Sequence, residues 1–330
     1  MSNLLGNVLK GNRAALAQAI TLLESTSMNR DFLQKKLNFI RDLNEAHHRN
    51  KPNTIRIGIS GSPGVGKSTF IESFGMFLIE QSKKKVAVLA VDPSSAVRGG
   101  SILADKTRMP RLTQSSNAFI RPSPSRLNFG GVTQSTGETI LLCETAGYDV
   151  VIVETVGVGQ SEYEVANLCD TFVLLVAPAS GDELQGIKKG IVEMANLIVI
   201  TKYDGDLIIP ARRMRGEIRS ATKYITYNER PSVICVSART NHGIEDVWKE
   251  IDKIVNQDQK AKQLKRQEQK VGLLRISLIN ALLNLLKPVI ENEAYEIRLK
   301  SDPKLSIYEI VQEIIHQDLY NILEKNKIRI

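Results

Sequence analysis

The segment GSPGVGKST at residues 61–69 constrains the fold of this chain more than any other feature. It matches the pattern GxxxxGK followed by Ser or Thr, comes after the apolar run IRIGIS, and leads into STFIESFGMFLIE, whose apolar residues have helical spacing. A strand, a glycine-rich loop and a helix in this order bind phosphate through backbone N–H groups at the helix N-terminus. The sequence therefore predicts a nucleoside triphosphate site.

Short apolar runs rich in Val and Ile alternate with helical stretches in the middle of the chain. They are IRIGIS (55–60), VAVLAVD (86–92), VVIVET (150–155), TFVLLVAP (171–178), LIVITK (197–202) and SVICVSA (232–238). This alternation favours a parallel sheet with helices on both faces. We therefore expect an α/β fold built on a doubly wound, mostly parallel sheet.

Helical patterns at both ends predict extensions to this sheet. Asn12 is expected to cap one N-terminal helix and Asp31 the next. Residues 257–270 are rich in charge and are expected to form a link or a helix without a core face, followed by two amphipathic helices. The expected division is a helical extension at 1–50, a nucleotide-binding domain at 51–255 and a helical arm at 256–330.

The phosphate loop supplies most of the predicted nucleotide contacts. The residues expected to bind the nucleotide here are Gly61, Ser62, Pro63, Gly64, Val65, Gly66, Lys67, Ser68 and Thr69. Lys67 is expected to neutralise the β- and γ-phosphates during catalysis, and the Ser68 hydroxyl to ligate Mg²⁺.

Three acidic residues are predicted to join this catalytic centre, at Mg²⁺ or at the attacking water. Asp92 ends one apolar run, Glu154 ends another, and Asp105 lies in a segment of small and polar residues. Carboxylates close to phosphate oxygens need a metal between them. For Asp105, capping of a following helix is the alternative. Gly157 is expected to offer its N–H to the γ-phosphate, and Gln160 is either a water-positioning residue or a loop or cap residue.

The segment TKYD at 201–204 resembles the guanine-reading pattern NKxD. The Asp204 carboxylate can accept from guanine N1–H and from the exocyclic amine, a donor pair that adenine does not present. The stem of Lys202 can lie over the base. Thr201 stands where that pattern has Asn, which normally supports the loop.

A second base-reading loop is predicted at VSAR, residues 236–239. Ser237, Ala238 and Arg239 are its candidate nucleotide contacts, with the Ala238 N–H placed to meet guanine O6. Because this segment follows the phosphate loop and TKYD in the expected order, the set favours guanine.

The segment PASGDELQGIKKG at 178–190 follows another apolar run and concentrates charge. Asp182, Gln185 and Lys188 are its candidate functional residues. A solvated helix start is the alternative, and the residues alone leave both interpretations open.

Together these motifs resemble the MeaB/ArgK family, which includes the human MMAA type. The matching segments are GSPGVGKST, DPSS, GGSILADKTRM, VIVETVGVGQSE, PASGDELQGIKKGI and TKYDGDLIIPARR. The resemblance implies a P-loop GTPase of the SIMIBI type that hydrolyses GTP to GDP and phosphate. It also implies that the C-terminal arm forms a homodimer.

The resemblance further implies a chaperone of methylmalonyl-CoA mutase or a related acyl-CoA mutase. Such a GTPase gates adenosylcobalamin loading and protects or reactivates the mutase, and Asp182, Gln185 and Lys188 would belong to a third switch loop. Leu127, Asn128 and Phe129 are bulkier than the family pattern suggests.

Two alternatives remain open, a kinase-like phosphotransferase of transport systems and a scaffold that binds GTP without hydrolysis. No arginine finger can be named from the sequence, so slow intrinsic turnover is expected. No DxHxxG motif occurs, so the chain alone is not expected to bind cobalamin.

Composition excludes several other classes. The net charge of +8 is spread along the chain, which disfavours nucleic-acid binding, and no long apolar run predicts a membrane span. Cys143, Cys169 and Cys235 are far apart and are expected to be reduced thiols. The N-terminus shows no secretory signal pattern, so we expect a cytoplasmic protein, or a mitochondrial matrix protein if a transit peptide has been removed.

Overall fold

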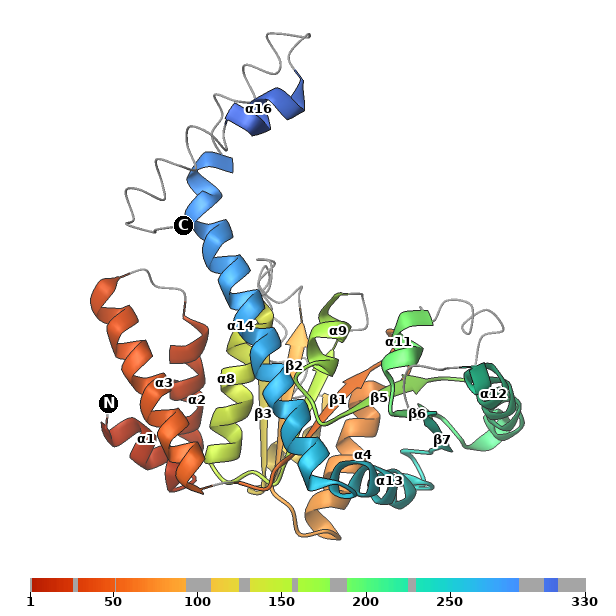
Figure 1. The fold of residues 1–330 in the computed structure, drawn as a ribbon. Helices are drawn as coiled ribbons and strands as arrows, with labels where there is room; N and C mark the ends of the chain where they lie inside the picture. The colour runs from red at the N-terminus through yellow and green to blue at the C-terminus, as the bar shows by residue number, and fades with distance from the viewer. Residues whose placement is uncertain are drawn as a thin grey trace. The chain divides into compact units, whose positions relative to one another are not determined.

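Seven strands form one sheet in the part of the chain that the structure describes (Figure 1). The structure is a computed structural model and describes residues 2–25, 29–50, 52–92, 108–124, 131–155, 160–178, 189–224, 230–290 and 306–313. The strands are β1 (Ile55–Ser60), β2 (Val86–Asp92), β3 (Ala118–Pro124), β4 (Val150–Thr155), β5 (Thr171–Val176), β6 (Leu197–Ile200) and β7 (Ser232–Cys235). Their order is β3-β2-β4-β1-β5-β6-β7, and every recorded pair is parallel, which confirms the predicted fold.

Strand β1 lies in the middle of this sheet and carries the phosphate loop at its end. It pairs with β4 on one side, where Ile57 is opposite Ile152, and with β5 on the other, where Ile57 is opposite Thr171. Strands β4 and β5 are buried along their whole length, which explains why they read as continuous apolar runs. The loop after β1 is therefore at the carboxyl edge, next to the ends of β4 and β5.

Strand β3 was not predicted from the sequence. Its segment AFIRPSP contains Pro122 and Pro124, and proline cannot donate a hydrogen bond to a neighbouring strand. Strand β3 is at the edge of the sheet and pairs with β2 alone, so its prolines are tolerated there.

Helices cover both faces of the sheet (Figure 1). The described helices are α1 (Ser2–Leu9), α2 (Arg13–Glu24), α3 (Arg30–Asn50), α4 (Lys67–Glu80), α7 (Pro110–Gln114), α8 (Gly131–Thr145), α9 (Gln160–Ala166), α11 (Lys189–Met194), α12 (Ile208–Ala221), α13 (Ile244–Asn256), α14 (Gln259–Ile290) and α16 (Ile307–Glu313). None of the described helices is both long enough and apolar enough to cross a bilayer. The chain divides into two compact units, Met1–Val271 and Gly272–Ile330, and the sheet belongs to the first.

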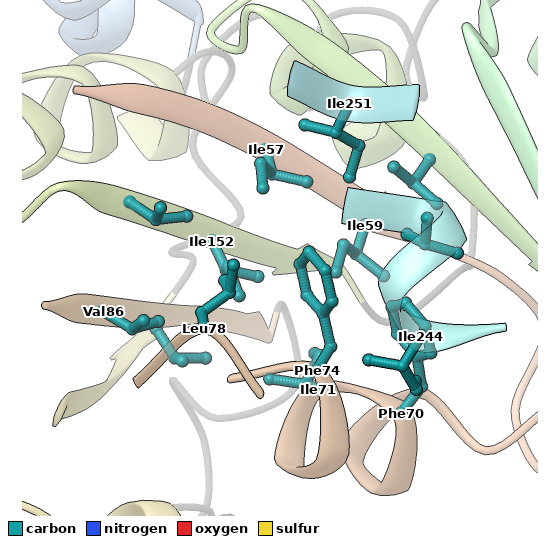
Figure 2. Close-up of a cluster of buried hydrophobic side chains, with 14 of the residues drawn as sticks. Ile57, Ile59, Phe70, Ile71, Phe74, Leu78, Val86, Ile152, Ile244 and Ile251 are labelled. Carbon is teal, nitrogen blue, oxygen red and sulfur yellow. The ribbon is translucent and has the colours of Figure 1, made fainter. Parts of the chain in front are cut away.

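The larger core cluster joins α4 and α13 to the central strands (Figure 2). Phe70 and Phe74 of α4 stack with their ring centroids 5.4 Å apart, and both are buried. Ile251 of α13 belongs to the same cluster and lies next to Ile57 of β1. A second cluster packs α9, α11 and α12 against the strands β5, β6 and β7. The phosphate loop is therefore attached to a buried helix, α4, whose position the core fixes.

The caps of the N-terminal helices agree with the sequence in one case and not in the other. The Asn12 side chain accepts from the N–H of Ala15 at 3.0 Å, which confirms its role at α2. The prediction for Asp31 is wrong, because α3 begins at Arg30 and Asn29 accepts from the N–H groups of Asp31 and Phe32. Asp31 lies inside the first turn, where an acidic side chain still favours the helix dipole.

The charged segment 257–270 has no apolar core face, as predicted, but it docks through polar side chains. Residues 259–270 form the start of α14, and Arg266 donates to both carboxylate oxygens of Asp170, at 2.8 and 2.7 Å. Lys265 donates to the Asp170 carbonyl at 2.7 Å, and Lys262 is only 9% exposed. Long charged side chains can bury their aliphatic stems, so a helix can dock without an apolar stripe.

A buried carboxylate, Glu144, joins this helix to two other segments. Arg56 of β1 donates to its two oxygens at 2.7 and 2.8 Å, and His47 of α3 lies 2.8 Å from one of them. Arg266 of α14 is 3.6 Å away. Burial would raise the pKa of Glu144, but the bonds from Arg56 and His47 and the charge of Arg266 lower it to about 2. Helix α3, strand β1 and helix α14 thus meet electrostatically at one carboxylate of α8.

Candidate nucleotide-binding site

The phosphate loop has the backbone that its glycines predict. Gly64 and Gly66 have φ values of 83° and 98°, in the left-handed region that other residues rarely adopt. A Cβ on Gly61 would lie 2.5 Å from the carbonyl oxygen of Leu175, so the loop passes too close to β5 for a side chain. Gly66 is also the N-cap of α4, which directs the free N–H groups of that helix toward the loop.

A cavity of about 610 Å³ opens beside this loop. Its lining combines loop residues with the ends of β2 and β4: Pro63, Gly64, Gly66, Lys67, Ser68, Thr69, Ala90, Val91, Arg108, Glu154 and Thr155. The structure therefore brings six of the nine predicted loop residues and Glu154 together around one space, although β1 and β4 are far apart in the sequence. Gly61, Ser62 and Val65 are not among the residues that line it.

Lys67 is bent back over the loop. Its ammonium donates to the carbonyl oxygens of Gly61 at 2.7 Å and Ser62 at 3.2 Å. Burial lowers the pKa of Lys67 and so does the charge of Arg108, whereas the carboxylates of Glu154 and Glu162 raise it. The result is a partly desolvated cation at the wall of the cavity, suited to an anionic ligand.

Two of the predicted Mg²⁺ ligands lie on this wall. Ser68 and Glu154 both line the cavity, and Glu154 is 9% exposed at the end of β4. A hydroxyl and a carboxylate are the hard oxygen donors that Mg²⁺ prefers, so the side chains fit this ion. Asp92 ends β2, as predicted, but its side chain is not among the described ones. Within the described residues, no three His, Cys, Asp or Glu side chains cluster as a metal site.

Thr201 links the base-reading segment directly to the phosphate loop. Its hydroxyl is hydrogen-bonded to the carbonyl oxygens of Val65 at 2.7 Å and Val176 at 3.1 Å. Next to it, Lys202 has a φ of 57° and its ammonium donates to the Gly64 carbonyl at 3.0 Å. Threonine therefore supports the loop at the position where the guanine-reading pattern has asparagine.

Asp204 is held by the second base-reading loop. The Ser237 hydroxyl donates to the Asp204 carboxylate at 2.5 Å, and Ser237 is completely buried. The backbone N–H of Tyr203 donates to the Val236 carbonyl at 3.0 Å, which joins the two loops a second time. The Ala238 carbonyl accepts from Ser73 of α4 at 2.9 Å, whereas Arg239 is exposed. The predicted residues of both loops thus lie side by side.

The remaining candidate residues cannot be placed. Those outside the described part of the chain are Asp105, Gly157, Asp182, Gln185 and Lys188, together with Leu127, Asn128 and Phe129. Gln160 is the first residue of α9, and its side chain is likewise not described. The roles assigned to all of them stay predictions.

Four residues of the cavity lining were not predicted, Ala90, Val91, Arg108 and Thr155, and Arg108 is the charged one among them. Arg108 lines the space beside Lys67 and Ser68, and its side chain is exposed. The only signal was its position in the segment ADKTRM, three residues after Asp105. An arginine in a polar segment is usually a surface residue, so the spacing alone did not distinguish it.

Comparison with protein families gives one match over most of the chain. The family described as "Methylmalonyl Co-A mutase-associated GTPase MeaB" matches residues 16–291.

Individual relatives agree with that match. A mouse protein named "Methylmalonic aciduria type A homolog, mitochondrial" is 55% identical over 248 residues, which cover 73% of this chain and 60% of the mouse protein. The GTPase ArgK of Escherichia coli is 51% identical over 242 residues, 72% of this chain and 71% of that protein. A crystal structure of an "LAO/AO transport system kinase" is similar with a TM-score of 0.72 and 35% identity, over 95% of both chains.

Proposed function

Because the chain belongs to the MeaB family of GTPases, we propose that it hydrolyses GTP to control a cobalamin-dependent acyl-CoA mutase. In this proposal the nucleotide state gates the loading of adenosylcobalamin into methylmalonyl-CoA mutase or a related enzyme, and it protects or reactivates that enzyme. The observation that carries the proposal is the cavity at the phosphate loop, with two base-reading loops beside it in a chain that matches a mutase-associated family.

The chemistry proposed for this cavity is attack of water on the γ-phosphorus of GTP. A new P–O bond forms, the bond from the γ-phosphorus to the β-bridging oxygen breaks, and GDP leaves with that electron pair. Lys67 and the loop N–H groups would stabilise the charge on the transferring group. Bound Mg²⁺ would neutralise phosphate charge, held by Ser68 and Glu154 and by the predicted Asp92 and Asp105.

Preference for guanine would come from Asp204. Ser237 holds one carboxylate oxygen in place, and the carboxylate is then positioned to accept from the N1–H and exocyclic amine of guanine. Adenine offers an acceptor at N1, so it would face the carboxylate with the wrong polarity. Lys202, fixed by its bond to Gly64, would cover the base with its stem.

Coupling to the mutase would use the predicted third switch with Asp182, Gln185 and Lys188. The described residues beside it support a mechanical route. A Cβ on Gly190 of α11 would clash with the hydroxyl of Tyr163 in α9, so the two helices are in contact at this glycine. Helix α9 follows the segment of Gly157, the predicted γ-phosphate contact, and α11 follows the predicted switch. A shift of one helix would therefore displace the other.

We also propose that a second copy of the chain binds the C-terminal arm. Apolar residues are exposed at helical spacing along α14, with exposed fractions of 50% for Val271, 58% for Leu274 and 55% for Leu278. A row of this kind is stabilised by burial against a partner surface. Light scattering should report a dimer for the wild type and a monomer for Leu274→Glu with Leu278→Glu, whereas Lys270→Glu, outside the row, should stay dimeric.

A phosphotransferase remains the second candidate, because a similar solved structure carries the name of a transport-system kinase. One assay separates the candidates. Phosphate release from GTP is measured alone, with methylmalonyl-CoA mutase, and with arginine or ornithine, while the amino acids are tested for phosphorylation. Release that the mutase accelerates supports the chaperone proposal, and phosphorylated amino acid supports the kinase. If GTP binds but no phosphate is released under any of these conditions, the result supports a scaffold that binds GTP without hydrolysing it.

We place the protein in the cytoplasm, or in the mitochondrial matrix if the host is eukaryotic. The mouse relative is named as mitochondrial. Fractionation of the native host with an antibody to the chain tests this placement.

A further inference from the structure

Two cationic side chains, Lys67 and Arg108, line the same wall of the nucleotide cavity. Lys67 is the expected phosphate ligand of the loop. Arg108 has no counterpart in that loop motif, and no ion pair to it is recorded among the described residues. Like charges that share a partly buried wall repel one another, and Glu154 is the one carboxylate in the described lining of this cavity. Arginine keeps its charge, and Glu154 balances only one of the two cations, so an anion in the cavity would offset the remaining charge.

The backbone that carries Arg108 is fixed to the phosphate-loop helix. Met109, the next residue, is completely buried, and helix α7 begins at Pro110. The Glu72 carboxylate of α4 accepts from the backbone N–H groups of Arg111 at 2.7 Å and Leu112 at 3.3 Å. Helix α4 itself begins at Lys67. Helix α4 therefore supplies the cap of α7, so the backbone of Arg108 is fixed relative to that of Lys67.

Packing strengthens this attachment. A Cβ on Gly75 of α4 would lie 2.9 Å from the side chain of Leu112, so α7 rests directly on α4 at a position that needs glycine. Leu112 is completely buried in the core cluster that also contains Phe70 and Phe74. Arg108 thus combines an anchored backbone with an exposed guanidinium at the cavity, where it can reach an anionic ligand.

We propose that Arg108 is a catalytic arginine that this chain supplies to its own nucleotide, in contact with the γ-phosphate during hydrolysis. The proposal rests on the proposed hydrolysis of GTP. As water bonds to the γ-phosphorus and the bond to the β-bridging oxygen breaks, the guanidinium donates to the γ-phosphate oxygens. Its N–H groups form a planar fork that fits two phosphate oxygens at once, which the point charge of Lys67 cannot do.

The test is steady-state GTP turnover by the full chain with Arg108→Ala, Arg108→Lys and a matched control, Arg111→Ala. The Arg111 guanidinium pairs on the surface with Glu80 at 3.1 Å, away from the cavity lining. Arg108→Ala should lower kcat about 100-fold, as removal of one preorganised donor does, while GDP affinity changes by less than about 3-fold. Arg108→Lys should be intermediate, Arg111→Ala should equal wild type, and guanidinium ion at millimolar concentration should restore part of the Arg108→Ala rate.

The outcomes distinguish the catalytic role of Arg108 from the proposed hydrolysis of GTP. Equal kcat for wild type, Arg108→Ala and Arg111→Ala overturns the catalytic role. A higher KM for GTP with an unchanged kcat also overturns it, because Arg108 would then bind the nucleotide without acting on the transferring phosphoryl group. Absence of hydrolysis by wild type, alone and with the mutase, instead rejects the proposed function. Fluorescent GDP binding by each variant verifies that it is folded.

Discussion

The two predicted sides of the nucleotide site, the base-reading loops and the phosphate loop with its cavity, are built differently. On the base side, Asp204 is bonded to Ser237, and Thr201 is bonded to the carbonyl of Val65. On the phosphate side, Lys67 and Arg108 line a cavity with their charges close enough to interact. The base side is thus organised by hydrogen bonds between separate loops, whereas the phosphate side presents two cations to the cavity, and the Lys67 ammonium bonds only to carbonyls of its own loop.

This difference predicts how each side responds to mutation. A contact that is preformed gives specificity at a small entropic cost, because the groups are already ordered before binding. Cations that face a shared cavity gain most of their interaction energy when the anion arrives. Mutations on the phosphate side should therefore change turnover and affinity most, and mutations on the base side should change selectivity or loop stability.

The largest expected effect is that of Lys67→Ala. Removal of the ammonium takes away the main counter-charge to the transferring phosphoryl group, so GTP turnover should fall about 1,000-fold. Phosphate release and fluorescent GTP binding measure the two parts of this loss. Lys249→Ala is the matched control, because Lys249 pairs with Glu245 on the exposed side of α13. Turnover of Lys67→Ala within a factor of three of that control would show that the loop is not the catalytic site.

The phosphate loop could be predicted in detail because its chemistry is local in the sequence. Glycines, Lys67 and Ser68 follow one another, and the strand and helix around them have clear periodicity. Arg108 could not be predicted in this way, since its place at the cavity depends on the cap that Glu72 gives to α7. Such a contact joins residues about forty positions apart, and no spacing rule encodes it.

The second prediction concerns the Glu144 cluster, which consists of Glu144, His47, Arg56 and Arg266. None of these residues lines the nucleotide cavity, and the cluster, like the base side, is held by contacts within the chain. The folded pKa of Glu144 is about 2, below its ordinary value of 4.5, so the carboxylate stabilises the fold above pH 4.5 and this contribution is lost as pH falls toward 2. The full difference corresponds to about 3 kcal/mol.

The measurement is urea unfolding of wild type and Glu144→Gln across this pH range. The advantage of wild type should be largest near neutral pH and should shrink between pH 4.5 and 2. GTP affinity near neutral pH should be the same for both proteins, because no residue of the cluster lines the nucleotide cavity. A constant difference in stability at every pH would contradict the assignment of this ionic role.

The third prediction concerns selectivity. Asp204→Asn replaces an acceptor by a donor, so the guanine preference should fall about 30-fold and xanthosine nucleotides should bind better than in wild type. Competition between fluorescent GDP and unlabelled nucleotides measures both changes. Asp206→Asn is the control, since Asp206 is an exposed carboxylate two residues away. An equal response of the two variants would mean that Asp204 does not read the base.

The helical parts of the chain were predicted less completely than the sheet. The start of α14 has no apolar core face, as predicted, yet Lys262 and Arg266 bind the residues that precede β1 and β5 through their long stems and polar heads. Edge strand β3 was missed because its prolines are unusual in a strand. Periodicity detects apolar burial and does not detect docking by ion pairs. The three-part division at residues 50 and 255 stays a prediction.

The smallest expected effect is that of Thr201→Val, and it tests whether the base side really is preformed. Valine keeps the shape of threonine but removes the hydroxyl, so the carbonyls of Val65 and Val176 lose a bond in a buried place, at a cost of about 1 to 2 kcal/mol. GDP affinity should fall about 5-fold, because the loop that carries Lys202 is less well ordered before binding, while kcat at saturating GTP stays near wild type. Thr201→Ser keeps the hydroxyl and should restore most of the affinity. If Thr201→Val lowers kcat and leaves GDP affinity unchanged, the hydroxyl acts on the phosphate side of the site, and the contrast between the two sides does not hold.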